Sequence, residues 1–324
     1  MLKKSLYLTV LLSIFVNKSP FCQTPDFTQV STNLLYSNPA FAGAIICPKL
    51  YLEYRNRFLS LGSAYQTFYG SYDQYLHQVS GDIGIVLIHD RQAKGYIKNT
   101  QLGLIYAKEI PLSKKMNFKL GVETDYFLHS ASNKELSYPD QIDPFYGYIY
   151  NSNEEYFTYS THKINVSAGL LLYNERFFAG ISMYNINQPK SPNYKKSFLL
   201  LREYIAHGGA KFNLSKSPKV KSDITTIIQL QLENPYTLGI IGANLRVNQL
   251  VLGLWNKQNF TLKNESFSIL IGFVEKKYKF AYNCDMSFSG ASSKKIDSHE
   301  VSFTYYFNCI DFKRKIRAIR CPGF

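Results

Sequence analysis

Six histidines are the first candidates for chemistry in this 324-residue chain, because His serves as a general base and as a metal ligand. His89, followed by Asp90 and Arg91, is the best candidate centre for a hydrolase. The chain contains no Gly-x-Ser-x-Gly elbow and no His-Glu-x-x-His pair. The histidines also fall in six separate segments, so we expect no enzyme and no cofactor: His77, His89, His129, His162, His207 and His299.

Acidic residues offer a second kind of site, for a metal ion. Carboxylates gather in one loop-like segment but lack the spacing of a calcium-binding loop. His299 and Glu300 are adjacent, so on a strand they point to opposite faces and cannot share a metal. We therefore expect no metal site, either there or among the loop carboxylates, which are Asp140, Asp143, Glu154 and Glu155.

The elements that carry these residues are strands. From Lys49 to Phe307 the chain repeats one pattern about fourteen times, a strand-length run with an apolar or aromatic residue at every second position. In the last copy Val301 and Phe303 share one face, whereas Glu300 lies on the other. The predicted fold class is all-β, a transmembrane antiparallel β-barrel of the outer membrane with about 14 strands, lipid outside and a polar lumen within.

Connection lengths support the same prediction. In such barrels short turns at one rim alternate with longer loops at the other, and here connection length largely follows parity. The segments 131–160 and 186–199 are the longest, whereas 233–235 is a short exception. The predicted strands are 49–57, 65–76, 81–90, 98–109, 116–130, 161–173, 176–185, 200–213, 221–232, 236–246, 249–255, 266–275, 278–288 and 298–308.

Composition excludes other classes of protein. Aromatic residues make up 15% of the chain, yet the mean hydropathy is only −0.18. No uncharged run approaches the ~20 residues of a spanning helix, which excludes a helical membrane protein. The formal net charge of +14 suggests an acidic partner. For an exported protein we expect lipopolysaccharide phosphates, acidic surface polymers or a periplasmic protein rather than nucleic acid.

The two ends lie outside the strand pattern. We predict a signal peptide at 1–22, a plug-like or periplasmic segment at 23–48, the barrel at 49–308 and a basic tail at 309–324. An even strand count predicts that both termini are periplasmic. The tail is either a solubilising end or a docking site for an acidic periplasmic protein, and its cations are Lys313, Arg314, Lys315, Arg317 and Arg320.

Four cysteines remain after the predicted cleavage, in a compartment where disulfides persist. Barrel closure would bring Cys47 to the same rim as Cys309 and Cys321, so a disulfide could join the two ends. Free thiols, including Cys284, are the alternative.

An ordered set of short motifs covers nearly the whole mature chain. It includes Asp26–Gln29, Tyr36–Gly43, Tyr54–Arg57, Ser71–Tyr75, Gly81–Gly84, Asp90–Arg91, Tyr138–Asp140, His299–Ser302 and Arg317–Pro322. In these motifs the chain resembles the PorP/SprF family of outer-membrane proteins of the type IX secretion system. The resemblance implies the outer membrane of a Gram-negative bacterium with gliding motility or protein secretion.

The resemblance also implies a function and partners. A non-enzymatic component would support secretion or surface attachment of an adhesin-like cargo with a C-terminal secretion domain. Other secretion components, a periplasmic peptidoglycan-linked protein and the lipid bilayer would be its partners. The candidate partner contacts are Asn38, Pro39, Phe41, Tyr138 and Asp140.

Two other functions stay open at this point. A passive channel or hydrophobic-solute transporter would suit the same barrel, and a barrel hydrolase would use His89.

Overall fold

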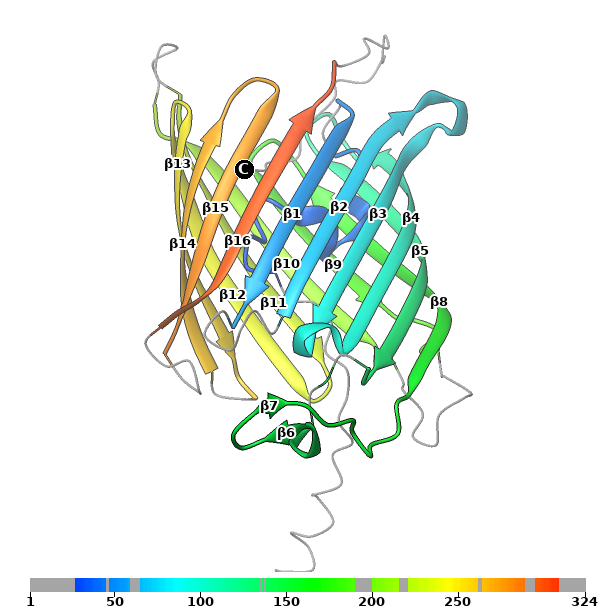
Figure 1. Cartoon of the computed structure of the whole chain (residues 1–324). Helices are drawn as coiled ribbons and strands as arrows, with labels where there is room; N and C mark the ends of the chain where they lie inside the picture. The colour runs from blue at the N-terminus through cyan, green and yellow to red at the C-terminus, as the bar shows by residue number, and fades with distance from the viewer. Residues whose placement is uncertain are drawn as a thin grey trace, which may run out of the picture.

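The chain folds into a closed antiparallel β-barrel of fourteen strands, which confirms the predicted fold class (Figure 1). The computed structural model describes residues 27–44, 47–58, 65–134, 136, 138–189, 200–215, 221–261, 264–288 and 295–308. The barrel strands are β1 (Lys49–Arg57), β2 (Tyr65–Leu76), β3 (Gly81–Gln92), β4 (Ile97–Pro111), β5 (Asn117–Ser132), β8 (Thr158–Tyr173), β9 (Phe177–Tyr184), β10 (Glu203–Asn213), β11 (Ser222–Glu233), β12 (Tyr236–Val247), β13 (Leu250–Asn259), β14 (Asn264–Val274), β15 (Tyr278–Ser287) and β16 (Lys295–Tyr306).

The barrel closes where the last strand meets the first. β1 pairs with β2 on one side and with β16 on the other, in register from Lys49 opposite Tyr306 to Arg57 opposite Ser298. Closure gives every strand two partners, so no row of backbone N–H and C=O groups is left unpaired toward lipid.

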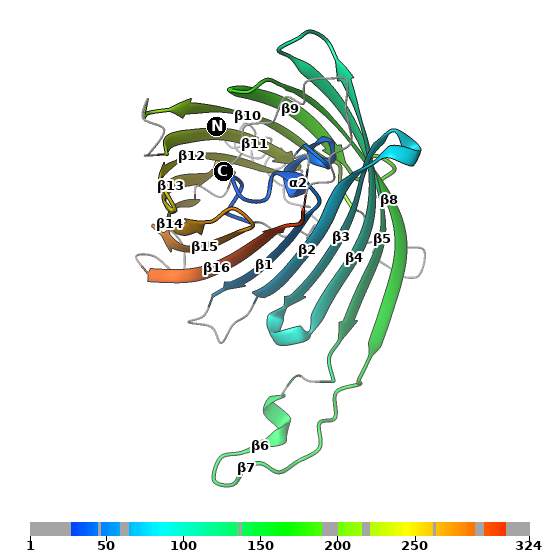
Figure 2. The same ribbon diagram turned by 90° about the horizontal axis from the view of Figure 1, so that it is seen from above.

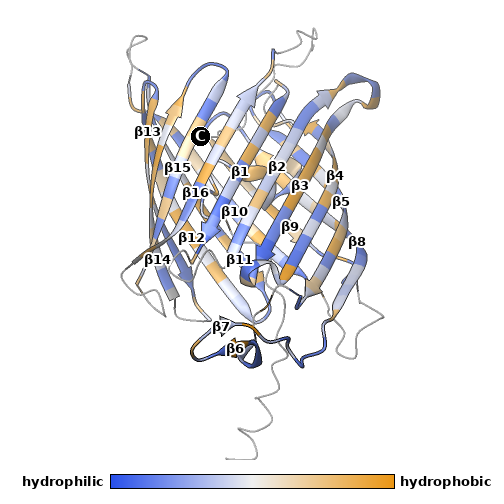
Figure 3. Cartoon of the chain, viewed as in Figure 1, coloured by the Kyte–Doolittle hydropathy of each residue, from blue (hydrophilic) through white to orange (hydrophobic). Residues whose placement is uncertain are grey.

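Side chains alternate between a polar interior and an apolar exterior, as β5 shows. Glu123 and Asp125 point inward and are buried, whereas Val122 and Tyr126 are about half exposed on the outside. The same alternation of polar and apolar residues runs along the other strands (Figure 3). A soluble protein would bury its apolar face, so this inverted arrangement fits lipid outside the barrel.

The two rims differ in the length of their connections. One rim, here the short-connection rim, carries the turns at 77–80, 112–116, 174–176, 214–221, 248–249 and 275–277. The opposite, long-connection rim carries 58–64, 93–96, 133–157, 185–202, 260–263 and 288–294, together with the short turn 234–235 that the sequence marked as the exception. The short turns include η3 (His77–Val79), and η4 (Ala93–Gly95) lies at the other rim.

The connection between β5 and β8 has structure of its own. It contains η5 (Pro139–Gln141) and a small hairpin of β6 (Ile142–Asp143) and β7 (Gly147–Tyr148). Figure 2 shows this hairpin projecting well away from the ring of strands. We call residues 138–157 the hairpin loop.

Among the residues that the structure describes, helical structure is limited to short turns. Inside the ring lie α2 (Leu34–Ser37) and η1 (Pro39–Phe41). Within the described parts of the chain, no helix has the length and hydropathy needed to cross a membrane.

The apolar exterior gives a depth-dependent prediction for stability. Leu104 lies at the middle of β4 and is 62% exposed, whereas Leu112 follows the end of that strand and is 58% exposed. Leu104→Arg should cost about 2–4 kcal/mol of folding free energy in lipid vesicles, and Leu112→Arg about 0–1 kcal/mol, because only the first charge sits at the bilayer midplane. Equal costs for the two variants in denaturant titrations would contradict the membrane orientation.

Candidate functional site

The chain's own N-terminal segment lies in the lumen. Residues 27–44, here called the plug, lie inside the barrel, with α2 visible within the ring of strands (Figure 2). All plug residues except Thr32, Leu34 and Tyr36 are buried. The sequence left two positions open for this segment, inside the barrel or beneath it, and its described part lies inside.

The plug runs along the barrel axis. Thr28 Oγ1 donates to Asp285 Oδ2 at 2.8 Å, close to the end of β15 that leads to the long-connection rim. At the other end the Gly43 N–H donates to Asp73 Oδ2 at 2.8 Å, near the end of β2 at the short-connection rim. The first described residues therefore lie in the half of the lumen nearer the long connections, and the orientation of the termini remains a prediction.

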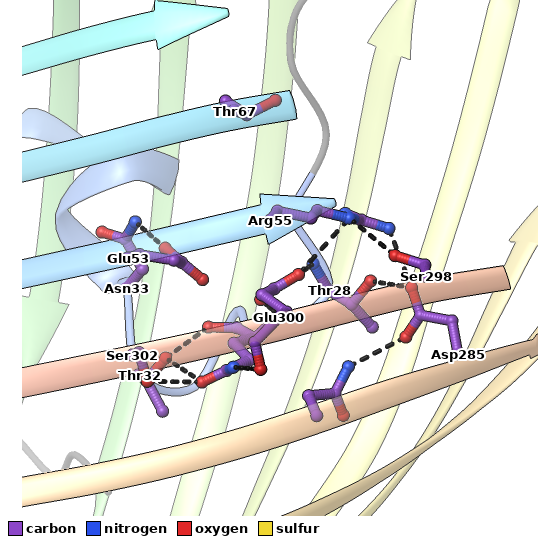
Figure 4. A network of polar contacts seen from close by, with 12 residues as sticks. Thr28, Thr32, Asn33, Glu53, Arg55, Thr67, Asp285, Ser298, Glu300 and Ser302 are labelled. Atoms are coloured by element: carbon purple, nitrogen blue, oxygen red, sulfur yellow. Dashed lines mark hydrogen bonds and ion pairs between the residues drawn. The ribbon is translucent and has the colours of Figure 1, made fainter. Parts of the chain in front are cut away.

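A buried ionic network holds the first end of the plug (Figure 4). Glu300 accepts the backbone N–H of Thr28 at 3.1 Å and that of Gln29 at 2.8 Å. Arg55 pairs with Glu300 at 3.5 Å and with Asp285 at 2.8 Å. We call this group the latch. Hydrogen bonds to charged groups contribute about 1.5–3 kcal/mol each, and loss of one buried partner leaves the others uncompensated.

Asn38 anchors the middle of the plug and is fully buried. Its Nδ2 lies 3.0 Å from the carbonyl oxygen of Leu170 and 3.0 Å from His207 Nε2. Its Oδ1 accepts the N–H of Ala40 at 2.8 Å and so caps η1. Asn38 thus caps η1 within the plug and also bonds the plug to the wall.

Where the plug turns, the wall beside it consists of glycine residues, which have no side chain. Gly121 and Gly169 are directly paired across β5 and β8, and Pro39 and Ala40 lie against them. A Cβ at Gly121 would come within 2.5 Å of the Pro39 carbonyl carbon. At this pair the two glycines make room for the plug.

The far end of the plug is held by ion-paired wall residues. Asp73 accepts from Gly43 and also pairs with Lys49 at 3.1 Å. Lys119 donates to the carbonyl oxygen of Ala42 and pairs with Asp82 at 2.6 Å. Both ends and the middle of the plug are therefore bonded to the wall.

In the hairpin loop two acidic side chains, those of Asp140 and Asp143, bind the loop's own backbone. Asp140 accepts from the Asn153 N–H at 2.7 Å. Asp143 accepts from the N–H groups of Phe145 and Tyr146, which hold the pKa of its carboxyl below the ordinary value. Among the described residues no three His, Cys, Asp or Glu side chains lie close enough to hold a metal ion.

The His89 cluster does not assemble. His89 faces outward and contacts Thr100 Oγ1 at 2.9 Å, whereas Asp90 faces the lumen and accepts from Thr67 at 2.6 Å. His299 and Glu300 also point to opposite faces of their strand, as alternation predicted.

The candidate partner contacts divide into two groups. Asn38, Pro39 and Phe41 are buried in the plug and are out of reach of a partner while the plug is in place. Tyr138 and Asp140 stabilise the hairpin loop, where the Tyr138 N–H donates to Gln141 Oε1 at 2.8 Å.

Other predicted features fall at the chain ends. The signal peptide and the basic tail, with Lys313, Arg314, Lys315, Arg317 and Arg320, lie outside the described residues. Cys47 is disulfide-bonded, Cys284 is free, and Cys309 and Cys321 are outside the described residues. The pairing of Cys47 with either of those two remains a prediction.

Sequence reasoning missed the latch and the wall lysine that holds the plug. Arg55, Glu300, Asp285 and Lys119 do carry a signal, because each is a charged residue at an inward position of an alternating strand. Their partners could not be read from the pattern.

Comparisons with known proteins give one family and a set of distant folds. A family model described as "Type IX secretion system membrane protein PorP/SprF" matches residues 20–305. No curated protein sequence matches the chain. Among solved structures, the Acinetobacter baumannii outer membrane protein Omp33 is 6% identical in sequence to this chain, with a TM-score of 0.46. The match covers 81% of this chain and 99% of the Omp33 chain. The CymD monoaromatic hydrocarbon channel is 10% identical in sequence, with a TM-score of 0.45. That match covers 87% of this chain and 94% of the CymD chain.

The glycine contact predicts how the plug can be loosened. Gly121→Ala should raise amide exchange across the plug about tenfold, because ~1.4 kcal/mol of lost packing is tenfold in an opening equilibrium. The clash is with plug backbone, which cannot swing aside as a side chain would. Hydrogen–deuterium exchange with mass spectrometry measures it.

Gly208→Ala is the matched control, since its Cβ would meet only the Phe178 carbonyl oxygen at 3.5 Å, an ordinary contact. Equal protection of the plug in both variants would refute the seating of the plug on Gly121.

Proposed function

The chain belongs to the PorP/SprF family of type IX secretion system membrane proteins, and we propose that it is a non-enzymatic outer-membrane component that supports secretion or surface attachment of a cargo protein. The cargo we propose is adhesin-like and carries a C-terminal secretion domain. The observation that supports the proposal is the bonded plug, because a lumen occupied by the plug leaves the rims as the surfaces on which a partner can act.

The hairpin loop is the proposed contact for the cargo. Phe145 is 92% exposed and Tyr146 79%, and Tyr148 and Tyr150 are also exposed. Exposed aromatic residues of this kind mark interaction surfaces, where Tyr and Phe are enriched. The carboxylates of Asp140 and Asp143 hold the loop in shape, so its aromatic side chains need little further ordering on binding.

The orientation of the barrel supports this choice. In barrels of this class short turns face the periplasm and long loops face the outside. The hairpin loop belongs to the long-connection rim, so on this proposal it faces the outside, where a surface-attached protein would be held. The short-connection rim and the basic tail then face the periplasm, where we propose that the tail docks on an acidic protein that reaches peptidoglycan.

One purification experiment tests both surfaces. Phe145→Ser with Tyr146→Ser should lose the cargo, and truncation before Lys313 should lose the periplasmic partner but keep the cargo. The two changes remove separate contacts, hydrophobic in the loop and electrostatic in the tail. Mass spectrometry of proteins that copurify in mild detergent from the native bacterium gives the result.

The loop variant and the tail truncation serve as controls for each other. Phe260→Ser is a further control, for loss of an exposed aromatic residue elsewhere at the same rim. Phe260 is 57% exposed in the 260–263 connection at the same rim. If the loop variant retains the same secreted protein as the unmodified chain, the cargo role of the hairpin loop is wrong.

Conductance separates the proposed function from a passive channel. The plug should block steady ion flow through the unmodified barrel in a planar bilayer, and deletion of residues 27–44 should open it. A steady conductance of the unmodified protein would favour the channel. No conductance in the deletion variant, once shown to be folded, would mean that the plug is not what closes the lumen.

A further inference from the structure

Two cations lie side by side on the outer, lipid-facing surface of the barrel, next to the long-connection rim. Arg91 on β3 and Lys98 on β4 are directly opposite each other in the strand register, and both point outward. We call them the cation pair. Both side chains are partly exposed. The outer surface of a membrane barrel is apolar over the lipid, so two adjacent charges there call for a partner.

The outward residues of β3 and β4 change in character toward this rim. Near the middle of the strands Leu87 is opposite Leu102, and both are about half exposed. The next outward pair is His89 and Thr100, which lie 2.9 Å apart between Nδ1 and Oγ1. The cation pair follows at the end of the series. The surface thus passes from apolar to polar to charged, as a membrane does from its hydrocarbon core to its headgroups.

The depth of the cation pair matches the headgroup level. From position 104, at the middle of β4, to position 98 is six residues, or about 20 Å along the strand at ~3.4 Å per residue. Strands of such barrels are tilted by roughly 35–45°, so the rise along the membrane normal is about 15 Å. Half the thickness of the hydrocarbon core is also about 15 Å. Long cationic side chains at this level reach the phosphate groups of the lipids.

The cation pair is unfavourable without a negative charge beside it. Like charges directly opposite each other on one face of a sheet destabilise it. On β2 the residue opposite Arg91 is Gln66, and on β5 the residue opposite Lys98 is Ser130. Neither Gln66 nor Ser130 carries a charge. Asp90 is next to Arg91 in sequence but faces the lumen. The described neighbours on the outer surface therefore supply no counter-charge.

The Arg91 side chain also lacks a partner among the described residues. Its Nε is buried and makes no hydrogen bond within the described structure. None of the ion pairs in the described part of the chain includes Arg91. A guanidinium in this position suits a phosphate, because its planar fork of N–H donors matches two phosphate oxygens. The lysine directly beside it adds a second positive charge for the same group.

We propose that the cation pair binds a phosphate group of lipid A, the membrane anchor of lipopolysaccharide. Arg91 donates two hydrogen bonds to the phosphate oxygens, and Lys98 supplies the second positive charge. The choice of lipid rests on the proposed orientation of the barrel, in which the long-connection rim faces the outside and meets the outer leaflet. A phosphate monoester such as that of lipid A also carries up to about two negative charges, which balance two cations.

Native mass spectrometry of the full-length protein in a neutral detergent tests the site. Bis-phosphorylated lipid A should bind with a dissociation constant on the order of 10 μM. Arg91→Gln combined with Lys98→Gln should weaken this binding at least about tenfold, because both charges at the phosphate are lost. Arg91→Gln alone is the second variant if the double variant does not fold.

Lys108→Gln is the matched control. Lys108 lies on the same outward face of β4 but near the short-connection rim, where its amine donates to the carbonyl oxygen of Ser80. Its replacement removes a positive charge from the outer surface and leaves the cation pair intact, so the affinity for lipid A should stay unchanged. Phosphatidylglycerol is the second probe. It should bind more weakly than lipid A, since its phosphodiester carries a single negative charge.

The proposal is overturned if lipid A does not bind the unmodified protein, or if the double variant binds it as tightly. Phosphatidylglycerol binding as tightly as lipid A would overturn the assignment to lipopolysaccharide. Because the titration uses the purified chain without cargo, it can fail while the cargo role stands. Loss of the cargo role would likewise leave the lipid titration unchanged.

Discussion

The structure depends on one constraint, the pairing of every strand on both edges. In lipid an unpaired backbone N–H or C=O has no water to bind, so a sheet in a membrane must close on itself. Nine residue pairs between β1 and β16 complete that closure. Once the ring is closed, alternation sends one half of the side chains to lipid and the other half to the lumen. The apolar surface of Leu104 and the buried carboxyl group of Glu123 are two results of the same geometry.

A closed ring of this size has an interior that wall side chains do not fill by themselves. The plug occupies part of this interior, and both the backbone and the side chains of the wall are fitted to it. Paired Gly121 and Gly169 let the plug approach the backbone, and Asn38 bonds to the wall beside them. Charges on the wall then meet the plug's own N–H and C=O groups, which could not otherwise be buried without cost.

The sequence predicts the strands of the barrel wall far better than the contacts of the plug inside it. Alternation located β1 and β2 to the residue. It ended β13 at residue 255, whereas the strand runs to Asn259, since Asn256 and Gln258 near the rim do not show an apolar face. The sequence offered a plug as one of two positions for this segment, but the bonds that anchor it were beyond prediction for a different reason. They join residues such as Gln29 and Glu300, 271 positions apart, and no local pattern specifies such a partner.

The latch connects the plug to the closure itself. Arg55 on β1 and Glu300 on β16 are directly opposite each other in the register that closes the barrel. The carboxylate that binds Thr28 and Gln29 is therefore brought beside its arginine only when the first and last strands have paired. Before closure, Arg55 lies near one end of the chain and Glu300 near the other, with no pairing to bring them together. The plug and the seam thus stabilise each other, and a partner that pulled on the plug would act on the strand pair that holds the barrel shut.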